Sequence, residues 1–215
     1  LRPTVKGTRL GTTYLSPKPL INEEAYLMLA KYEAQIMDNK CEIKCFPWMR
    51  QEVDISVCAH VAAWTILRYY GNKYHNYADT TMGAIAQKIK GDMGRKTPSN
   101  GLTPVQIADL FQEYGFSPII RGGIKEENSK FLDEIMAYIE SGIPIVGFIS
   151  PKQHAVSIVG HGRINYDLLD NPVSVDKLKD EQTGIILHSK LIPSLYVMED
   201  NYFGYRKVSK ELPTS

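Results

Sequence analysis

The sequence lacks an apolar run long enough to cross a bilayer, for which a helix needs roughly 18 residues. Its longest apolar stretch, residues 142–149, contains Pro144 and two glycines, and we interpret it as a buried strand. No secretory pattern of charged, apolar and small residues is present, and the chain begins at Leu1 rather than Met. We therefore expect no membrane span, and a trimmed or processed piece of a longer polypeptide fits this start.

An excess of charge of either sign is also missing. Lys and Arg number 25 against 24 Asp and Glu, which gives a net charge of +1. A near-neutral chain has no bulk electrostatic attraction for a polyanion, so we expect no nucleic-acid partner and no binding to anionic membrane surfaces.

Cysteine is scarce, with three residues in the chain. An odd, low count argues against a disulfide scaffold. Cys41 and Cys45 lie in a predicted strand, where four residues at about 3.3 Å each would hold the sulfurs too far apart to bond. A reducing, cytoplasmic compartment is favoured, and a secreted effector remains the alternative.

The composition is that of a folded protein. The 215 residues are 43% hydrophobic and 23% charged, enough to bury a sizeable core. Residues 1–21 are rich in Thr, Gly and Pro and predict an extended arm. We expect a single domain over residues 22–215.

Helical patterns dominate the first half. Asn22, Glu23 and Glu24 resemble a helix start, and apolar residues at helical spacing continue it to about residue 37. Thr103, Pro104 and Gln106 predict a capping box. The elements expected here are helices at about 22–37, 57–70 (closed by Gly71), 82–90, 103–115 and 130–140, and a strand at 41–46.

The second half is rich in β-forming residues separated by turn signals. Strands are expected at about 145–149, 154–159, 184–187, 195–198 and 205–208, with an exposed, charged insertion at 166–182. Helices followed by strands indicate an α+β fold, with a helical part at about 22–142 and a sheet part at about 143–210.

Cys58 lies in the first turn of a predicted helix, where the helix dipole favours a thiolate. A small buried cysteine is the plainer interpretation of this residue alone. His154 begins a predicted strand after a turn, which suits a general base at the edge of a cleft, although an ordinary surface histidine is the favoured interpretation of this residue alone. Cys58 and His154 indicate a catalytic site only when they are considered together.

Two further residues complete such a set. Asp200 follows the predicted strand at 195–198 and can accept a hydrogen bond from the histidine ring, or it can simply form a turn with Asn201. Asn201 becomes the alternative if the strand register shifts by one residue. Gln51, seven positions before Cys58, can donate to an oxyanion or be a solvated loop residue.

These residues stand in motifs that resemble the papain-like cysteine peptidases, including the bacterial branch described as C39-like. The resemblance covers roughly residues 41–208. The segments that carry it are residues 51–64 (QEVDISVCAHVAAW), 142–146 (GIPIV), 154–162 (HAVSIVGHG) and 196–204 (YVMEDNYFG).

The resemblance implies a papain-like α+β fold, with the cleft between a helical N-terminal lobe and an antiparallel sheet. It also implies a thiol peptidase that cleaves peptide or isopeptide bonds of a peptide or protein substrate without a cofactor. Cys58 would be the nucleophile, His154 the base, Asp200 the third member and Gln51 the oxyanion donor. Two departures are that Gln51 stands one residue farther from Cys58 than is usual, and that residues 166–182 enlarge the gap before Asp200.

Other functions use the same residues. A transglutaminase or deamidase effector acting on protein glutamine would use the same three groups, and a degenerate module could bind peptide without turnover. A purely structural α+β domain is the remaining alternative. We predict no metal site, because the sequence has neither paired CxxC nor HExxH spacing. His60 is predicted to be a helix residue that cannot serve as the base, because residues two apart do not share a helix face.

Overall fold

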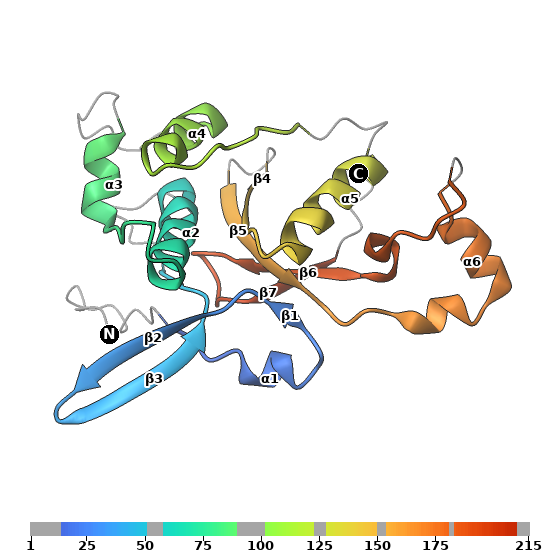
Figure 1. Cartoon of the computed structure of the whole chain (residues 1–215), viewed down its shortest axis with the longest axis horizontal. Coiled ribbons are helices and arrows are strands. Elements are labelled where there is room, and N and C mark those ends of the chain that lie inside the picture. Colours follow the sequence, from blue (N-terminus) through green and yellow to red (C-terminus); the bar gives the residue numbers. More distant parts are fainter. Residues whose placement is uncertain are drawn as a thin grey trace.

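The structure is a computed structural model that describes residues 14–50, 58–89, 102–122, 128–149, 154–180 and 183–209. It combines a curled antiparallel sheet with helices packed on it (Figure 1), which confirms the predicted α+β, papain-like fold. Among the described residues, no helix is both long and apolar enough to cross a membrane.

The central strand of the five-stranded sheet is β5 (His154–His161). On one side it pairs with β6 (Ser194–Met198), which in turn pairs with β7 (Arg206–Ser209). Its other partners are β4 (Ile145–Ile149), which pairs with its first half, and β1 (Tyr26–Leu27), which pairs with its end.

Helices α2 (Cys58–Lys73) and α5 (Asn128–Glu140) both contact β5 and flank the β4–β5 pair (Figure 1). Helix α2 buries ten of its sixteen residues, because it is covered by the sheet and by other helices. It is therefore a core helix, and its first residue is held in a fixed position relative to β5.

The predicted helices of the central region are present. They are α2, α3 (Met82–Lys88), α4 (Pro104–Glu113) and α5. The capping box is confirmed, since Thr103 accepts from the Gln106 backbone N–H and Gln106 caps in return. Gly115, which follows α4, has a φ of +85°, a conformation that favours glycine.

Gly71 does not end its helix, contrary to the prediction, because α2 continues to Lys73. A Cβ at Gly71 would approach the Cα of Asp79 to 2.8 Å. The residue is needed for close packing of the helix against the chain that follows it, and not for a left-handed cap.

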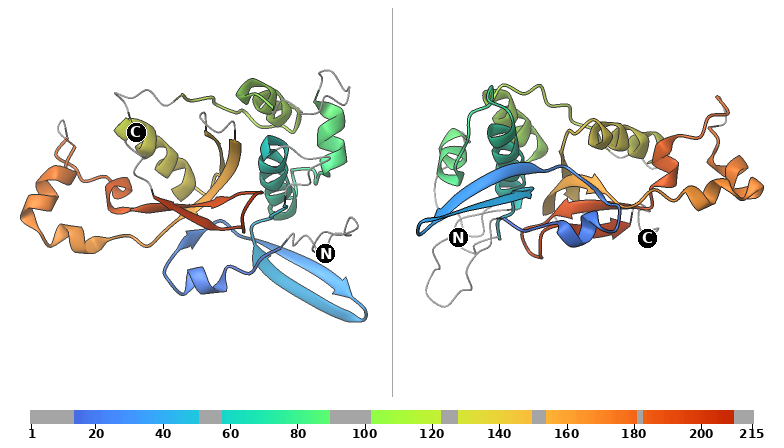
Figure 2. Two further views of the ribbon diagram at one scale, coloured as in Figure 1. Left: turned by 180° about the vertical axis from the view of Figure 1, so that it is seen from behind. Right: turned by 60° about the horizontal axis from the view of Figure 1, so that its bottom comes forward.

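The predicted helix at 22–37 is wrong. This segment instead forms β1 and β2 (Ala30–Ile36), and β2 pairs along its length with β3 (Asn39–Cys45) in a hairpin that projects from the domain (Figure 2). Met28, Ala30 and Tyr32 are buried at alternate positions, the two-residue period of a strand. The apolar residues fit both periods, and pairing with β3 decides between them.

The predicted strand at 184–187 is also wrong. Only an isolated bridge joins Ile186 to Lys179, and Ile185 and Leu187 are exposed. The insertion before it contains a 3-10 turn, η3 (Tyr166–Leu169), and helix α6 (Pro172–Leu178), which stand away from the sheet (Figure 1). Without a partner strand, β-forming residues do not make a sheet.

Part of the predicted N-terminal arm is folded onto the domain. Helix α1 (Lys18–Ile21) follows the fully buried Pro17, and the Tyr14 ring stacks on Tyr32 at 4.4 Å between centroids. Residues 1–13 of that arm lie outside the described residues.

Candidate active site

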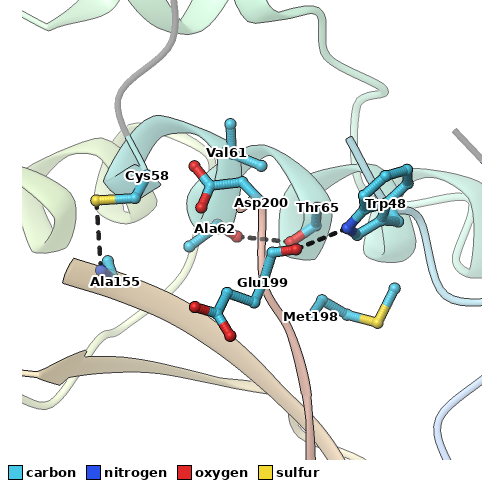
Figure 3. Close-up of a pocket in the computed structure, with 9 residues that line it drawn as sticks. All are labelled: Trp48, Cys58, Val61, Ala62, Thr65, Ala155, Met198, Glu199 and Asp200. Carbon is cyan, nitrogen blue, oxygen red and sulfur yellow. Dashed lines mark hydrogen bonds between the residues drawn. The ribbon is translucent and has the colours of Figure 1, made fainter. Parts of the chain in front are cut away.

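Cys58 opens α2 and lines a small pocket together with residues of β5 and the end of β6 (Figure 3). Val61, Ala62 and Thr65 line the same pocket. Their spacing of three, four and seven residues from Cys58 puts all four side chains on one face of the helix. That face is turned toward the sheet.

A buried polar contact fixes this face against β5. The hydroxyl oxygens of Thr65 and Ser157 lie 2.9 Å apart, and both lie within 3.0 Å of the Ala62 carbonyl oxygen. The two hydroxyl groups have one proton each. One hydroxyl therefore donates to the other hydroxyl, and the second donates to the Ala62 carbonyl oxygen. The contact holds the start of α2 close to the start of β5.

The Cys58 thiol is 7% exposed and accepts a hydrogen bond of 3.4 Å from the backbone N–H of Ala155 (Figure 3). Burial raises the pKa of this thiol. The Ala155 N–H opposes that rise, and the charge of Asp200 adds to it. A thiolate at this position therefore needs a nearby positive charge besides the dipole of α2.

His154, the residue before Ala155, begins β5 as the sequence predicted. Its Nε2 lies 3.2 Å from Oε1 of Glu199 and 3.7 Å from Oδ1 of Asp200. Ser157 pairs with Met198 in the antiparallel β5–β6 register, so the start of β5 faces the residues that follow β6. The histidine ring thus has two carboxylates beside one nitrogen.

Asp200 is 2% exposed and lines the same pocket as Cys58. Burial raises its pKa, the charge of His154 lowers it, and the neighbouring Glu199 raises it further. The alternative residue, Asn201, is exposed. Of the two, the structure brings Asp200 to the histidine.

Glu199 is the site residue that sequence reasoning missed. It is 8% exposed, its Oε2 accepts from Nη1 of Arg206 at 2.6 Å, and its backbone carbonyl accepts from the Trp48 indole at 2.8 Å. No local pattern marks this residue, because the groups that hold it, Arg206 and Trp48, come from other parts of the chain. If the strand alternation of β6 continued past Met198, the side chains of Glu199 and Asp200 would point to opposite faces of the sheet.

Two glycines of the His-Ala-Val motif lie where an added Cβ would meet a neighbouring segment, and of the two only Gly160 faces backbone. A Cβ at Gly160 would overlap the Tyr26 carbonyl oxygen of β1, and one at Gly162 would overlap the Ser194 hydroxyl. The β5–β6 register also shifts between Ile158 and Gly160. The motif therefore allows β1, β5 and β6 to pack closely beyond the site.

The remaining predicted residues lie elsewhere. Gln51 falls outside the described residues, so its role stays a prediction. His60 is partly buried on α2, and burial lowers its pKa. Within the described ranges, no three His, Cys, Asp or Glu side chains converge as metal ligands.

The three kinds of group gathered here have complementary chemistry. A thiol can attack an acyl carbon, an imidazole can carry its proton, and a carboxylate can orient and stabilise the imidazolium. The arrangement is suited to acyl transfer through a thioester.

Comparison with known proteins agrees at the level of family. No curated protein and no solved structure matches the chain. A family model described as "Peptidase_C39 like family" matches residues 42–182, which is more than half of the sequence and includes Cys58 and His154. The chain belongs to this C39-like family of papain-like cysteine peptidases.

Proposed function

We propose that this protein is a thiol peptidase that cleaves peptide or isopeptide bonds, with Cys58 as nucleophile, His154 as general base and Asp200 as the third member. One observation carries the proposal. The thiol accepts from the N–H that directly follows His154, while carboxylates meet the same histidine at Nε2. A thiol beside the start of the strand that carries the histidine, with carboxylates at the histidine ring, supports the set of thiol, imidazole and carboxylate that acyl transfer requires.

In the first half of the reaction, His154 takes the proton of Cys58 as the sulfur bonds to the acyl carbon. The carbon–nitrogen bond then breaks, and the imidazolium gives its proton to the leaving amine. In the second half, His154 takes a proton from water as the oxygen bonds to the thioester carbon. The carbon–sulfur bond breaks and the thiolate is reprotonated, which returns the enzyme to its starting state.

The tetrahedral intermediate needs hydrogen-bond donors for its oxyanion. We propose the backbone N–H of Cys58 as one donor, because it lies at the positive end of the α2 dipole. Gln51 is proposed as the second donor from its place in the sequence.

Iodoacetamide at low excess tests the activated thiol, because the attacking sulfur forms a bond to carbon and iodide leaves. The Cys41→Ser background removes the exposed thiol from the measurement. We expect fast single labelling by intact mass, lost in Cys58→Ala and slowed at least tenfold in His154→Ala. Slow labelling that does not depend on His154 would contradict the proposal and leave a binding module.

The products that the protein releases distinguish between the candidate reactions. A peptidase releases a new amino terminus from a protein or peptide library, whereas a deamidase releases ammonia from glutamine side chains and a transglutaminase joins an added amine to them. New amino termini that depend on Cys58 are expected. Release of ammonia or incorporation of amine, with no new amino terminus, would assign the other reaction.

A further inference from the structure

We propose that Glu199 is a positioning residue that orients the His154 imidazole, held in place for this task by Arg206 and Trp48. This inference rests on the proposed function, since it concerns how the base of that reaction is held. It gives part of the role of the third member to a residue that the motif at 196–204 contains but that the sequence analysis did not single out.

The first argument is distance. Oε1 of Glu199 lies 3.2 Å from Nε2 of His154, whereas Oδ1 of Asp200 lies 3.7 Å from the same nitrogen. Neither contact has the alignment of a hydrogen bond, since Nε2 of His154 and both carboxylate oxygens of Asp200 are buried without a hydrogen-bond partner among the described residues. The shorter distance gives Glu199 the stronger charge interaction with a protonated ring.

The second argument is how firmly Glu199 is held. Its other carboxylate oxygen accepts from Arg206 at 2.6 Å, and Trp48 donates to its backbone carbonyl at 2.8 Å. The Arg206 guanidinium in turn lies over the Tyr202 ring, 4.5 Å from its centroid. A carboxylate fixed at both its backbone and its side chain can fix the ring that it contacts.

The third argument is charge. Arg206 balances the charge of Glu199, whereas the charge of Asp200 raises the pKa of the Cys58 thiol and so opposes the thiolate. In the view of Figure 3, the Asp200 carboxylate lies beside α2 and the Glu199 side chain extends the other way. Glu199 can therefore support an imidazolium at a smaller cost to the thiolate.

The test measures the rate of Cys58 alkylation by iodoacetamide from pH 4 to 9 in the Cys41→Ser background. Glu199→Gln keeps the shape of the side chain and removes its charge. We expect the pH of half-maximal rate to rise and the rate at pH 6 to fall roughly tenfold, because the thiolate–imidazolium pair loses its nearest counter-charge. Arg206→Gln, at a half-exposed position, removes the hydrogen bond that holds Glu199 and should move the profile in the same direction. The shift should be smaller, because the variant also removes a positive charge that offsets Glu199.

Glu140→Gln is the matched control. Oε1 of Glu140 lies 2.8 Å from Nε2 of His161 at the other end of β5, so this variant also removes a carboxylate from a histidine. Its profile should equal that of the parent. Thermal unfolding of each variant shows whether it is folded at the pH of the measurement. If Glu199→Gln is unfolded there, Arg206→Gln is used as the test variant instead.

The outcomes separate this inference from the proposed function. If the pH profile of alkylation is unchanged in Glu199→Gln and Arg206→Gln while labelling still depends on His154, the role of Glu199 is refuted and the proposed function still stands. A larger shift in Asp200→Asn than in Glu199→Gln also overturns it and returns the role to Asp200. Labelling independent of His154 refutes the proposed function itself.

Discussion

The hydroxyl oxygens of Thr65 and Ser157 lie 2.9 Å apart in the core, 1% and 0% exposed, and they join α2 to β5. Cys58 lies two turns before Thr65 on the same helix face, and His154 lies three residues before Ser157 on its strand. This contact sets the spacing between the proposed nucleophile and its base.

Removing one of these hydroxyls should cost stability. Ser157→Ala and Thr65→Val each leave the other hydroxyl with fewer partners, and we expect a loss of about 1–3 kcal/mol in the free energy of unfolding. The double variant should lose less than the sum of the two, because both single changes break one shared contact. Urea unfolding measures all three, and strictly additive losses would show that the hydroxyls do not interact.

Gly160→Ala should destabilise the sheet. The added Cβ has no room beside the Tyr26 carbonyl and lies 3.0 Å from the Cα of Leu27, so β1 must move. We expect a loss of about 2–3 kcal/mol in thermal or urea unfolding. Gly122→Ala, where nothing lies within 4 Å of an added Cβ, is the control and should change little. Equal stability of the two variants would contradict the close approach.

Asp200→Asn should raise stability at neutral pH. Burial raises the pKa of Asp200 above its ordinary value of 3.8. Between pH 3.8 and this raised pKa, the folded protein therefore keeps a proton on Asp200 that the unfolded chain has lost. Stability contributed by this group therefore falls as the pH rises from 3.8 through the folded pKa, and the charged form is penalised at higher pH. Asparagine carries no such penalty.

The stabilisation should be largest near pH 7 and vanish as the pH approaches 3.8. Its expected size is a few degrees in Tm, where about 2–4 °C corresponds to 1 kcal/mol in a domain of this length. Thermal unfolding of both proteins across this range is the measurement. Lower stability of the variant at pH 7 would mean that hydrogen bonds to the carboxylate outweigh its burial.

The two cysteines of β3 should differ in reactivity. Cys41 is exposed, whereas Cys45 is buried and its pKa is raised to about 12 by that burial. In Cys58→Ala, we expect Cys41 to be alkylated at the rate of an ordinary thiol and Cys45 to react only after unfolding. Peptide mapping after iodoacetamide treatment tells them apart, and rapid labelling of native Cys45 would show that the hairpin opens.

Local signals in the sequence were sufficient for several elements. The capping box at Thr103 and the placement of Cys58 at a helix start need only short-range hydrogen bonds and propensity, and the structure has both elements. His154 at the start of β5 was also predicted, because a run of β-forming residues after a turn signal indicates where a strand begins.

Where two periods fitted one segment, the sequence could not decide. Residues 22–37 carry apolar side chains at both helical and alternate spacing, and pairing of β2 with β3 and of β1 with β5 selects the strand. Residues 184–187 have β-forming side chains but, apart from the bridge at Ile186, no strand beside them. Strand formation depends on a neighbour, which local sequence does not supply.

The sequence by itself determined the order and type of the proposed active-site groups, a thiol at a helix start, an imidazole at a strand start and a carboxylate after the next core strand. Only the tertiary structure decided which carboxylates meet the imidazole. Glu199 and Asp200 are adjacent in the chain and both come within 4 Å of Nε2 of His154, because the chain leaves regular strand geometry after Met198 and Arg206 and Trp48 hold Glu199. Contacts between residues distant in sequence fix that geometry, so no local pattern could predict it.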